Sequence, residues 1–185
     1  MSIVTKLIGL LLLMVLSPLF IIMALIIILD DGFPILFRQK RIGLNNVHFW
    51  IYKFRTMKKD TPDIATHLLN DSHSLDTAIG PFLRKFSIDE LPQFINILKG
   101  EMVFIGPRPA LHNQDDLVEL RTQVGVHTLM PGVTGWAQVN GRDELSISDK
   151  VKMDEYYLKN QSLWLDVKIL FMTVFKVFKM EGVSH

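Results

Sequence analysis

The sequence contains no cysteine among its 185 residues, and its formal net charge is only +1. Without cysteine the protein has no disulfide framework, no thiol nucleophile and no thiolate metal site, which fits a reducing compartment. The near-zero net charge gives no global electrostatic argument for a nucleic-acid partner. No internal repeat or low-complexity tract is present. The length predicts one domain with something appended to it.

Charge is also missing from residues 7–29, a run of 23 residues that are mostly Leu, Ile, Val and Met. As a helix this run would be about 35 Å long, enough to cross a hydrocarbon core, and composition by itself favours one spanning helix. Ser17-Pro18 stands at its centre, where proline removes a backbone hydrogen bond and kinks a helix. The alternative is a re-entrant hairpin, which returns the chain to the side it came from.

Acidic residues are missing from residues 32–59, which carry seven Lys and Arg. Within this stretch, segments 35–42 and 47–54 flank residues 43–46 (GLNN), a pattern that predicts a β-hairpin. Its cations are suited to anionic lipid headgroups or to the phosphates of a substrate, and the alternative is a solvated basic face. We favour a functional role for Lys53 and Arg55, because they close the hairpin.

Residues 87–109, SIDELPQFINILKGEMVFIGPRP, place Asp89 and Glu90 before an apolar run at helical spacing. Ser87 and Glu90 match a capping box, so both could satisfy backbone donors. With Asp89 as the N-cap instead, Pro92 falls within the first turn, where little is lost. In either case the helix dipole keeps the carboxylates ionised and suits phosphate or a divalent cation. The local pattern by itself favours capping over catalysis.

Two further cations belong to this region. Arg84 precedes the stretch, and Arg108, in the Pro-Arg-Pro turn at its end, could face the two carboxylates. Residues 113–124 and 147–160 predict helices, separated by a glycine-rich loop that is neither a P-loop nor a dinucleotide fingerprint. Trp136 and Arg142, with two amides of this loop, suit a nucleobase, a ribose or a sugar. The alternative for Trp136 is burial in a structural turn.

The last predicted helix, residues 163–180, is rich in lysine and aromatic residues. It is too interrupted by charge to span a membrane. Its composition suits a helix lying in the headgroup region, and the alternative is a core helix packed on the domain.

Taken together, these motifs resemble those of the small monotopic phosphoglycosyl transferases, a family of bacterial sugar transferases. The matching elements cover essentially the whole chain and stand in order: Ser17-Pro18, RQKRIG, YKFRTM, LRKFSIDELPQ, GPRP and PGVTGWAQVNGR. The resemblance implies a re-entrant helix broken at Ser17-Pro18, with both ends on the cytoplasmic face, in place of a spanning helix. We therefore expect a mainly α fold with a small β-hairpin (α+β). Residues 1–31 would form the membrane anchor, and residues 32–185 a compact cytosolic catalytic domain with an interfacial C-terminal helix.

The resemblance also implies the reaction. The family transfers sugar 1-phosphate from a UDP-sugar to polyprenol (undecaprenyl) phosphate, which gives polyprenyl diphosphate sugar and UMP and initiates O-antigen, capsule or exopolysaccharide synthesis. Carried onto this chain, Asp89 would be the nucleophile and Glu90 its partner at a Mg²⁺ site. The phosphate-contacting and nucleotide-contacting residues would be Lys53, Arg55, Arg84, Arg108 and Arg142.

The implied partners are UDP-sugar, polyprenol phosphate and membrane lipids, with a homodimer and downstream glycosyltransferases as further expectations and no nucleic acid. The implied location is the cytoplasmic face of the bacterial inner membrane. Two rivals remain: a membrane-bound phosphohydrolase that uses the same aspartyl-phosphate chemistry with water as acceptor, and a non-catalytic module that binds anionic lipid.

Overall fold

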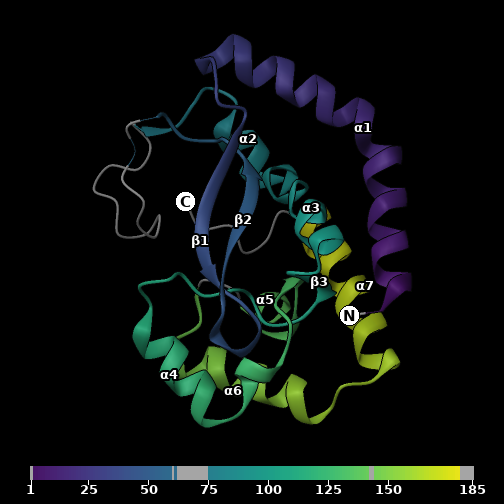
Figure 1. The fold of residues 1–185 in the computed structure, drawn as a ribbon, viewed down its shortest axis with the longest axis vertical. Coiled ribbons are helices and arrows are strands. Elements are labelled where there is room, and N and C mark those ends of the chain that lie inside the picture. The colour runs from purple at the N-terminus through teal and green to yellow at the C-terminus, as the bar shows by residue number, and fades with distance from the viewer. Residues whose placement is uncertain (1, 60, 62–74, 142–143, 180–185) are drawn as a thin grey trace.

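The computed structural model describes residues 2–59, 61, 75–141 and 144–179. The fold is α+β with helices predominating, as expected from the sequence. Figure 1 shows helix α1 along one side of the molecule, a β-hairpin in the middle, and helices α4 and α6 together at one end. The described residues form two small sheets, an antiparallel pair β1–β2 and a parallel pair β3–β4. The parallel pair was not predicted.

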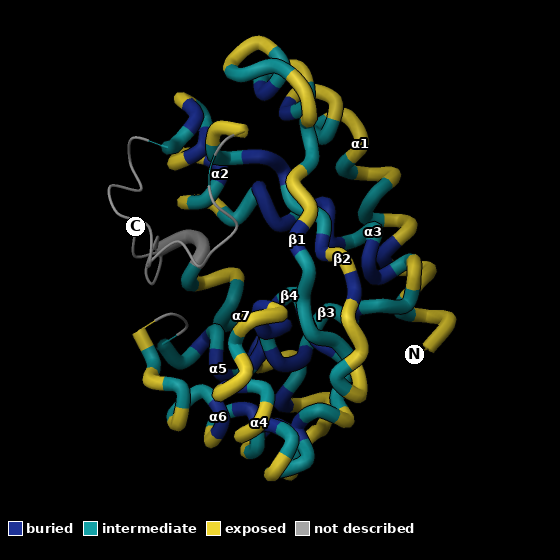
Figure 2. The backbone as a smooth tube through the Cα atoms, turned by 60° about the vertical axis from the view of Figure 1, so that its left-hand side comes forward, coloured by how far each residue is buried: buried dark blue, intermediate teal, exposed yellow. Residues whose placement is uncertain are grey.

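Helix α1 (Ile3–Asp31) contains the whole apolar run and continues through Pro18. Proline has no N–H to donate to the carbonyl of Met14 four residues earlier, and the Ser17 hydroxyl donates to that carbonyl instead, at 2.7 Å. The helix is bent near its middle rather than interrupted (Figure 1). It is long and apolar enough to cross a membrane, and most of its length is exposed or half-buried (Figure 2).

Two parts of α1 contact the rest of the protein. Gly9 packs on helix α3 (Gln93–Lys99), where an added Cβ would lie 3.2 Å from Cγ2 of Ile97. The last turns of α1 enter a hydrophobic cluster whose buried members are Met23, Ile27, Phe54 and Leu83. Both limbs of the bent helix are therefore fixed to the domain.

The predicted hairpin is confirmed. Strands β1 (Leu36–Ile42) and β2 (His48–Phe54) pair antiparallel, with Phe37 opposite Lys53. The connecting turn contains a short 3-10 segment, η1 (Leu44–Asn46), in which Asn45 and Asn46 have positive φ values of 51° and 60°. Asparagine tolerates this left-handed conformation better than most residues.

The central stretch forms short elements. Helix α2 (Gly80–Lys85), the 3-10 segment η4 (Ile88–Glu90) and helix α3 follow one another, and α3 ends at Gly100, whose φ is 84°. Strand β3 (Val103–Ile105) pairs with β4 (Gly132–Thr134). Their ends come so close that a Cβ on Gly132 would lie 2.1 Å from the Gly106 nitrogen, which excludes any side chain there.

Two of the next helices agree with the sequence predictions, and a third stands in the glycine-rich loop, which was expected to contain no helix. Helices α4 (Asp115–Gln123) and α6 (Ile147–Lys159) fall inside the two predicted ranges, and a short helix α5 (Trp136–Val139) lies in the glycine-rich loop. A 3-10 segment, η5 (Val126–Thr128), follows α4. Helices α4 and α6 lie side by side (Figure 1) and present buried Leu117 and Val151 to one hydrophobic cluster.

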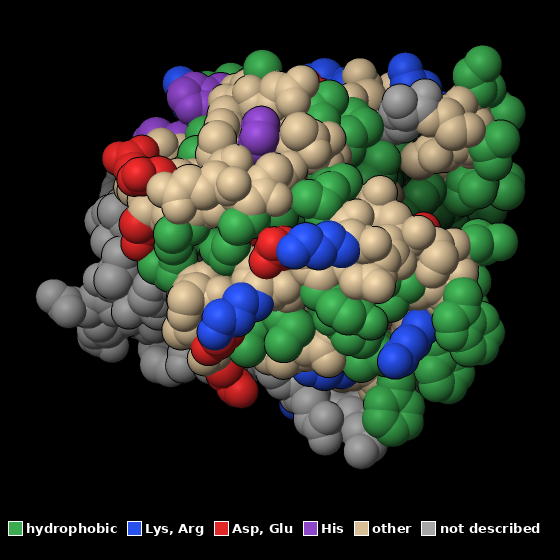
Figure 3. All heavy atoms as spheres, turned by 90° about the horizontal axis from the view of Figure 1, so that it is seen from below, with side chains coloured by type: hydrophobic (Ala, Val, Ile, Leu, Met, Phe, Trp, Pro, Cys, Tyr) green, Lys and Arg blue, Asp and Glu red, His purple; other side chains and the backbone are tan. Residues whose placement is uncertain are grey.

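Helix α7 (Leu163–Lys179) has two different faces. Leu165 and Ile169 are buried in a cluster with Val139 and Tyr157. Its other face exposes large apolar side chains: Leu163, Trp164, Val167, Leu170, Phe171, Val174 and Phe175. Figure 3 shows hydrophobic side chains gathered along one edge of the molecule, the side on which α1 and α7 lie in Figure 1. The helix thus packs on the domain and also presents an apolar surface.

Candidate active site

The carboxylates of Asp89 and Glu90 are buried, with 6% and 7% of each residue exposed. They lie in η4, between α2 and α3, and α3 begins only at Gln93. Ser87 has a left-handed φ of 54° and makes no side-chain capping bond, and Pro92 rather than Asp89 is the N-cap of α3. Both capping predictions are therefore wrong, because residues 88–91 turn once before the helix starts.

Two of the predicted cations meet these carboxylates. The Lys53 ammonium on β2 lies 2.8 Å from Oε1 of Glu90 and 3.7 Å from Oδ2 of Asp89. Arg108 Nη1 lies 3.1 Å from the same Glu90 oxygen. Lys53 is 37 residues from Glu90 in the sequence, so the meeting depends on how β2 packs against η4. Because both carboxylates are buried, these cations offset charge that would otherwise be costly to desolvate.

Arg55 and Arg84 have other partners. Arg55 is 4% exposed and holds the end of α1: its guanidinium pairs with the Asp31 carboxylate and donates to the main-chain oxygens of Asp31 and Gly32. Arg84 pairs with Asp76 and lies 3.4 Å from the Thr56 hydroxyl. Arg55 therefore anchors the apolar helix to β2, two residues from Lys53. Arg142 lies outside the described residues.

The turn that carries Arg108 is held at four consecutive carbonyls. Gly132 N donates to Pro107 O at 3.0 Å, and Ile42 N donates to Ala110 O at 3.0 Å. The two carbonyls between them accept from arginines: Arg121 Nη1 donates to Arg108 O at 2.8 Å, and Arg41 Nη1 donates to Pro109 O at 3.1 Å. The turn is therefore fixed from β4, β1 and α4 at once.

Arg121 is itself fixed by a buried ion pair that sequence reasoning missed. Its Nε and Nη2 both donate to Oδ2 of Asp154 on α6, at 2.9 and 2.5 Å. Burial raises the pKa of the Asp154 carboxyl, and the Arg121 guanidinium opposes that rise. The two residues are 33 positions apart, so only the packing of α4 on α6 brings them together.

Asn96 is a second residue that sequence reasoning missed. It is fully buried on α3, and its side-chain oxygen accepts from Tyr52 N at 3.1 Å while its amide donates to Trp50 O at 2.7 Å. The carboxamide thus bonds the free edge of β2 as a neighbouring strand would. A third contact, at 2.7 Å, goes to the Glu101 carboxylate. These hydrogen bonds fix the position of β2, which carries Lys53, relative to α3.

The polar residues of the glycine-rich loop mostly bond their own backbone. Gln138 donates to Val133 O at 3.1 Å, and Asn140 donates to Trp136 O at 2.7 Å. The Trp136 ring stacks on Tyr156 with centroids 5.5 Å apart, and the Lys168 ammonium lies 5.2 Å from its centroid. These contacts favour the structural alternative for Trp136.

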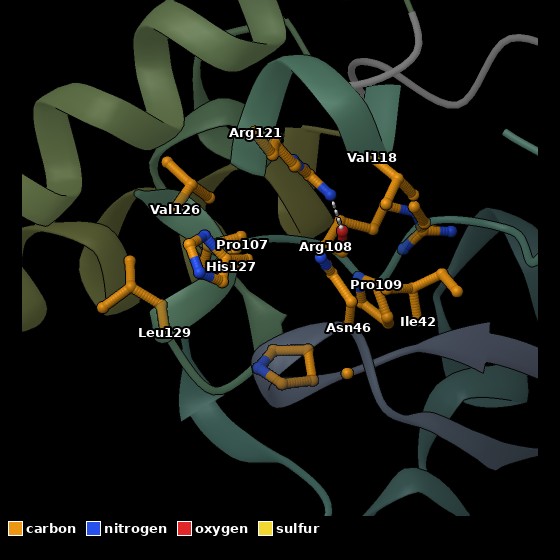
Figure 4. Close-up of a pocket in the computed structure, with 13 residues that line it drawn as sticks. Ile42, Asn46, Pro107, Arg108, Pro109, Val118, Arg121, Val126, His127 and Leu129 are labelled. Atoms are coloured by element: carbon orange, nitrogen blue, oxygen red, sulfur yellow. Dashed lines mark hydrogen bonds between the residues drawn. The ribbon is translucent and has the colours of Figure 1, made fainter. Parts of the chain in front are cut away.

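A small cavity lies behind the Pro-Arg-Pro turn, between the tip of the hairpin and α4 (Figure 4). Its volume of about 30 Å³ is enough for one or two water molecules. Arg121 points into the turn and reaches the Arg108 carbonyl, as the dashed line in Figure 4 marks. The cavity is too small to be the substrate site.

The described residues contain no group of three or more His, Cys, Asp or Glu side chains placed to hold a metal. Mg²⁺ commonly takes one or two carboxylates and completes its shell with substrate phosphates and water. Asp89 and Glu90 supply that number of oxygen donors, so the pair fits a magnesium ion that substrate helps to bind.

The sequence model of the bacterial sugar transferase family matches residues 2–180. The chain therefore belongs to this family, and the resemblance inferred from its motifs is confirmed. Among relatives, it is similar to the uncharacterized sugar transferase EpsL of Bacillus subtilis (strain 168). The two are 46% identical over 159 residues, which cover 85% of this chain and 76% of the relative.

Two longer relatives carry names that state a reaction. The UDP-glucose:undecaprenyl-phosphate glucose-1-phosphate transferase of Escherichia coli (strain K12) is 39% identical over 175 residues, 91% of this chain and 38% of the relative. The UDP-N-acetylgalactosamine-undecaprenyl-phosphate N-acetylgalactosaminephosphotransferase of Aeromonas hydrophila is 41% identical over 163 residues, 85% of this chain and 38% of the relative. The chain thus spans less than two fifths of either protein. Its membership and these relatives identify an enzyme of the transferase class.

Proposed function

We propose that the protein transfers sugar 1-phosphate from a UDP-sugar to polyprenol phosphate through a covalent intermediate on Asp89. The observation that carries the proposal is the buried carboxylate pair with Lys53 and Arg108 on Glu90, close to the anchored end of an apolar helix. A diphosphate brings negative charge to a nucleophile that is also anionic. Cations already placed at the carboxylates reduce that repulsion, and positioning supplies much of the remaining acceleration.

The contacts of the two carboxylates support different roles for them. One oxygen of Glu90 accepts from both Lys53 and Arg108, whereas the Lys53 nitrogen is 3.7 Å from Asp89. Two charge-assisted hydrogen bonds commit that Glu90 oxygen to the cations, so we assign the orienting role to Glu90 and the nucleophile to Asp89. Glu90 then orients the two cations that meet the donor phosphates.

The reaction proceeds as two displacements at the same phosphorus. An Asp89 oxygen attacks the β-phosphorus of the UDP-sugar, the bond from that phosphorus to the bridging oxygen breaks, and UMP leaves with the electron pair. A phosphate oxygen of the polyprenol phosphate then attacks the phosphosugar, and the Asp89 carboxylate leaves. The products are polyprenyl diphosphate sugar and regenerated enzyme.

Asp89 and Glu90 would also hold Mg²⁺ together with the donor phosphates. Such an ion supplies further neutralisation of phosphate charge. Lys53 and Arg108 perform the same task from the protein side, and burial of the pair excludes water that would hydrolyse the aspartyl phosphate.

The lipid acceptor requires an active site at the depth of the lipid headgroups. The bend of α1 at Ser17-Pro18 supports a re-entrant helix, and the exposed apolar face of α7 supports an interfacial helix. Arg55 ties the end of α1 to β2, so the membrane anchor and Lys53 share one rigid element. We place the protein on the cytoplasmic face of the bacterial inner membrane. A homodimer and contacts with downstream glycosyltransferases stay predictions.

The test is to trap the intermediate. Purified protein in lipid nanodiscs is incubated with UDP-sugar from a small panel, Mg²⁺ and no acceptor, and is then digested and analysed by mass spectrometry. We expect a peptide containing Asp89 to carry the mass of a phosphosugar, with about one equivalent of UMP released. Asp89→Asn should lose the adduct and turnover, whereas Asp115→Asn, at an exposed carboxylate, should keep both.

The rivals give different results in the same assay. A phosphohydrolase would release UMP continuously from the donor without polyprenol phosphate, whereas the transferase needs the lipid for net turnover. A lipid-binding module would show no UMP release and would be indifferent to Asp89→Asn. Absence of any adduct on Asp89, in protein that turns over with acceptor, would remove the covalent mechanism.

A further inference from the structure

The Pro107–Ala110 turn cannot hold its own shape through backbone hydrogen bonding alone. Its two prolines have no N–H to donate, and the carbonyls of Arg108 and Pro109 accept from guanidinium groups of other elements. Whatever direction the Arg108 side chain takes toward Glu90 is therefore set from outside the turn. The donors that set it come from β1, β4 and α4.

We propose that Arg121 is a positioning residue for Arg108 and that the buried Arg121–Asp154 pair serves to fix the active-site turn. The inference rests on the proposed function, because it assigns Arg108 to the donor phosphates. Arg121 binds no substrate. Its role is to hold the carbonyl of the residue whose own side chain contacts Glu90.

The contacts of Arg121 leave it little capacity for a phosphate. Nε and Nη2 are committed to Asp154 and Nη1 to the turn, and the residue is 8% exposed. The cavity beside it has room for water only. Because these donors are already bonded within the protein, Arg121 can influence the reaction only through the residues that it holds in place.

Stability alone does not explain the pair. A buried ion pair can often be replaced by apolar residues of similar volume without loss of stability, and α4 and α6 already share a hydrophobic cluster around Leu117 and Val151. What an apolar pair could not supply is a donor in a fixed plane at the Arg108 carbonyl. Arginine is suited to this because its rigid fork serves the carboxylate and the carbonyl together.

The test replaces the pair and asks whether its effect depends on Arg108. The variant Arg121→Met/Asp154→Leu removes the donor and leaves no stranded charge. We expect a thermal midpoint close to that of the parent, and a kcat for UMP release lower by about 10- to 100-fold, the scale of a misplaced catalytic contact. The matched control, Lys152→Met/Asp149→Leu, removes an exposed pair on α6 and should leave kcat unchanged.

The decisive arm is the same replacement in an Arg108→Ala background. If Arg121 acts only through Arg108, the replacement should cost less than about twofold there, because interacting residues are non-additive. The same four proteins are also compared by single-turnover labelling of Asp89, which can be measured even for variants whose kcat is too low to follow. An equal loss in both backgrounds would overturn the positioning role. Loss of labelling in the parent itself would instead overturn the proposed function, so the two failures are distinct.

Discussion

Replacing Asn96 with leucine tests whether one buried amide determines the position of Lys53. Leucine has nearly the same size, so the change removes the contacts to Tyr52 N, Trp50 O and Glu101 with little change in volume. Each backbone group left without a partner costs about 1–3 kcal/mol when buried. These groups are part-buried, so we expect the free energy of unfolding to fall by about 2–4 kcal/mol.

The assay has three readouts. Urea denaturation in nanodiscs gives the loss of stability, hydrogen exchange at the Tyr52 amide reports the freed strand edge, and UMP release reports the displacement of Lys53. We expect faster exchange at Tyr52 and a kcat lower by about tenfold, because Lys53 is the next residue along β2. Asn96→Asp should be no better than leucine, since it puts a second carboxylate against Glu101.

A matched control exists at Asn160, whose amide makes a single bond of 2.8 Å to Tyr156 O at an exposed helix end. Asn160→Leu should cost about 0.5–1 kcal/mol and leave kcat unchanged. The reasoning is refuted if Asn96→Leu leaves exchange at Tyr52 at the parental rate, or if it loses stability and keeps full kcat. In the second case Asn96 would stabilise the fold without positioning Lys53.

Three further predictions concern α1 and the contact between α6 and α7. Pro18→Ala should straighten α1, so that a cysteine placed at Ser2 is labelled from outside the cell instead of from the cytoplasm. Labelling from outside in the protein that keeps Pro18 would refute the re-entrant proposal. Gly9→Leu should lower the thermal midpoint and turnover through a clash with α3 costing about 1–3 kcal/mol, whereas Gly9→Ala should be milder. Burial and Asp166 raise the pKa of Tyr157 above its ordinary 10.0, so the unfolded state loses that proton first and stability falls above about pH 10. Tyr157→Phe should flatten this fall in denaturation experiments across that range, and an unchanged slope would contradict it.

The parts of the fold with strong local signals were predictable. Composition specifies α1, through its uncharged run. Conformational preference specifies the hairpin, through the GLNN turn, and the end of α3, through the glycine after residue 99. Accordingly α1, the hairpin and the end of α3 lie where the sequence places them. The predicted N-cap of α3 was wrong, because Ser87, Asp89 and Glu90 are all residue types that are common near helix N-termini. The choice among them was decided by a preceding 3-10 turn.

The sequence indicated which residues form the site better than it indicated which contacts they make. Glu90 and Arg108 stand within one stretch, 18 positions apart, with α3 and β3 between them. Arg55 carries the same charge as Lys53 and lies two residues away, yet the structure places it on the end of α1. Charge alone gives no means of telling which of two nearby cations reaches a distant carboxylate.

The sequence by itself determined the apolar helix α1, the hairpin, the helices α4, α6 and α7 and the residue types of the site, because these depend on neighbouring residues. Tertiary structure alone decided that Lys53 meets Glu90, that Asn96 completes the edge of β2 and that Arg121 holds the turn. These contacts join residues 37, 46 and 13 positions apart. They depend on how helices and strands pack against one another, and hydrophobic periodicity specifies which face is buried without specifying what it meets.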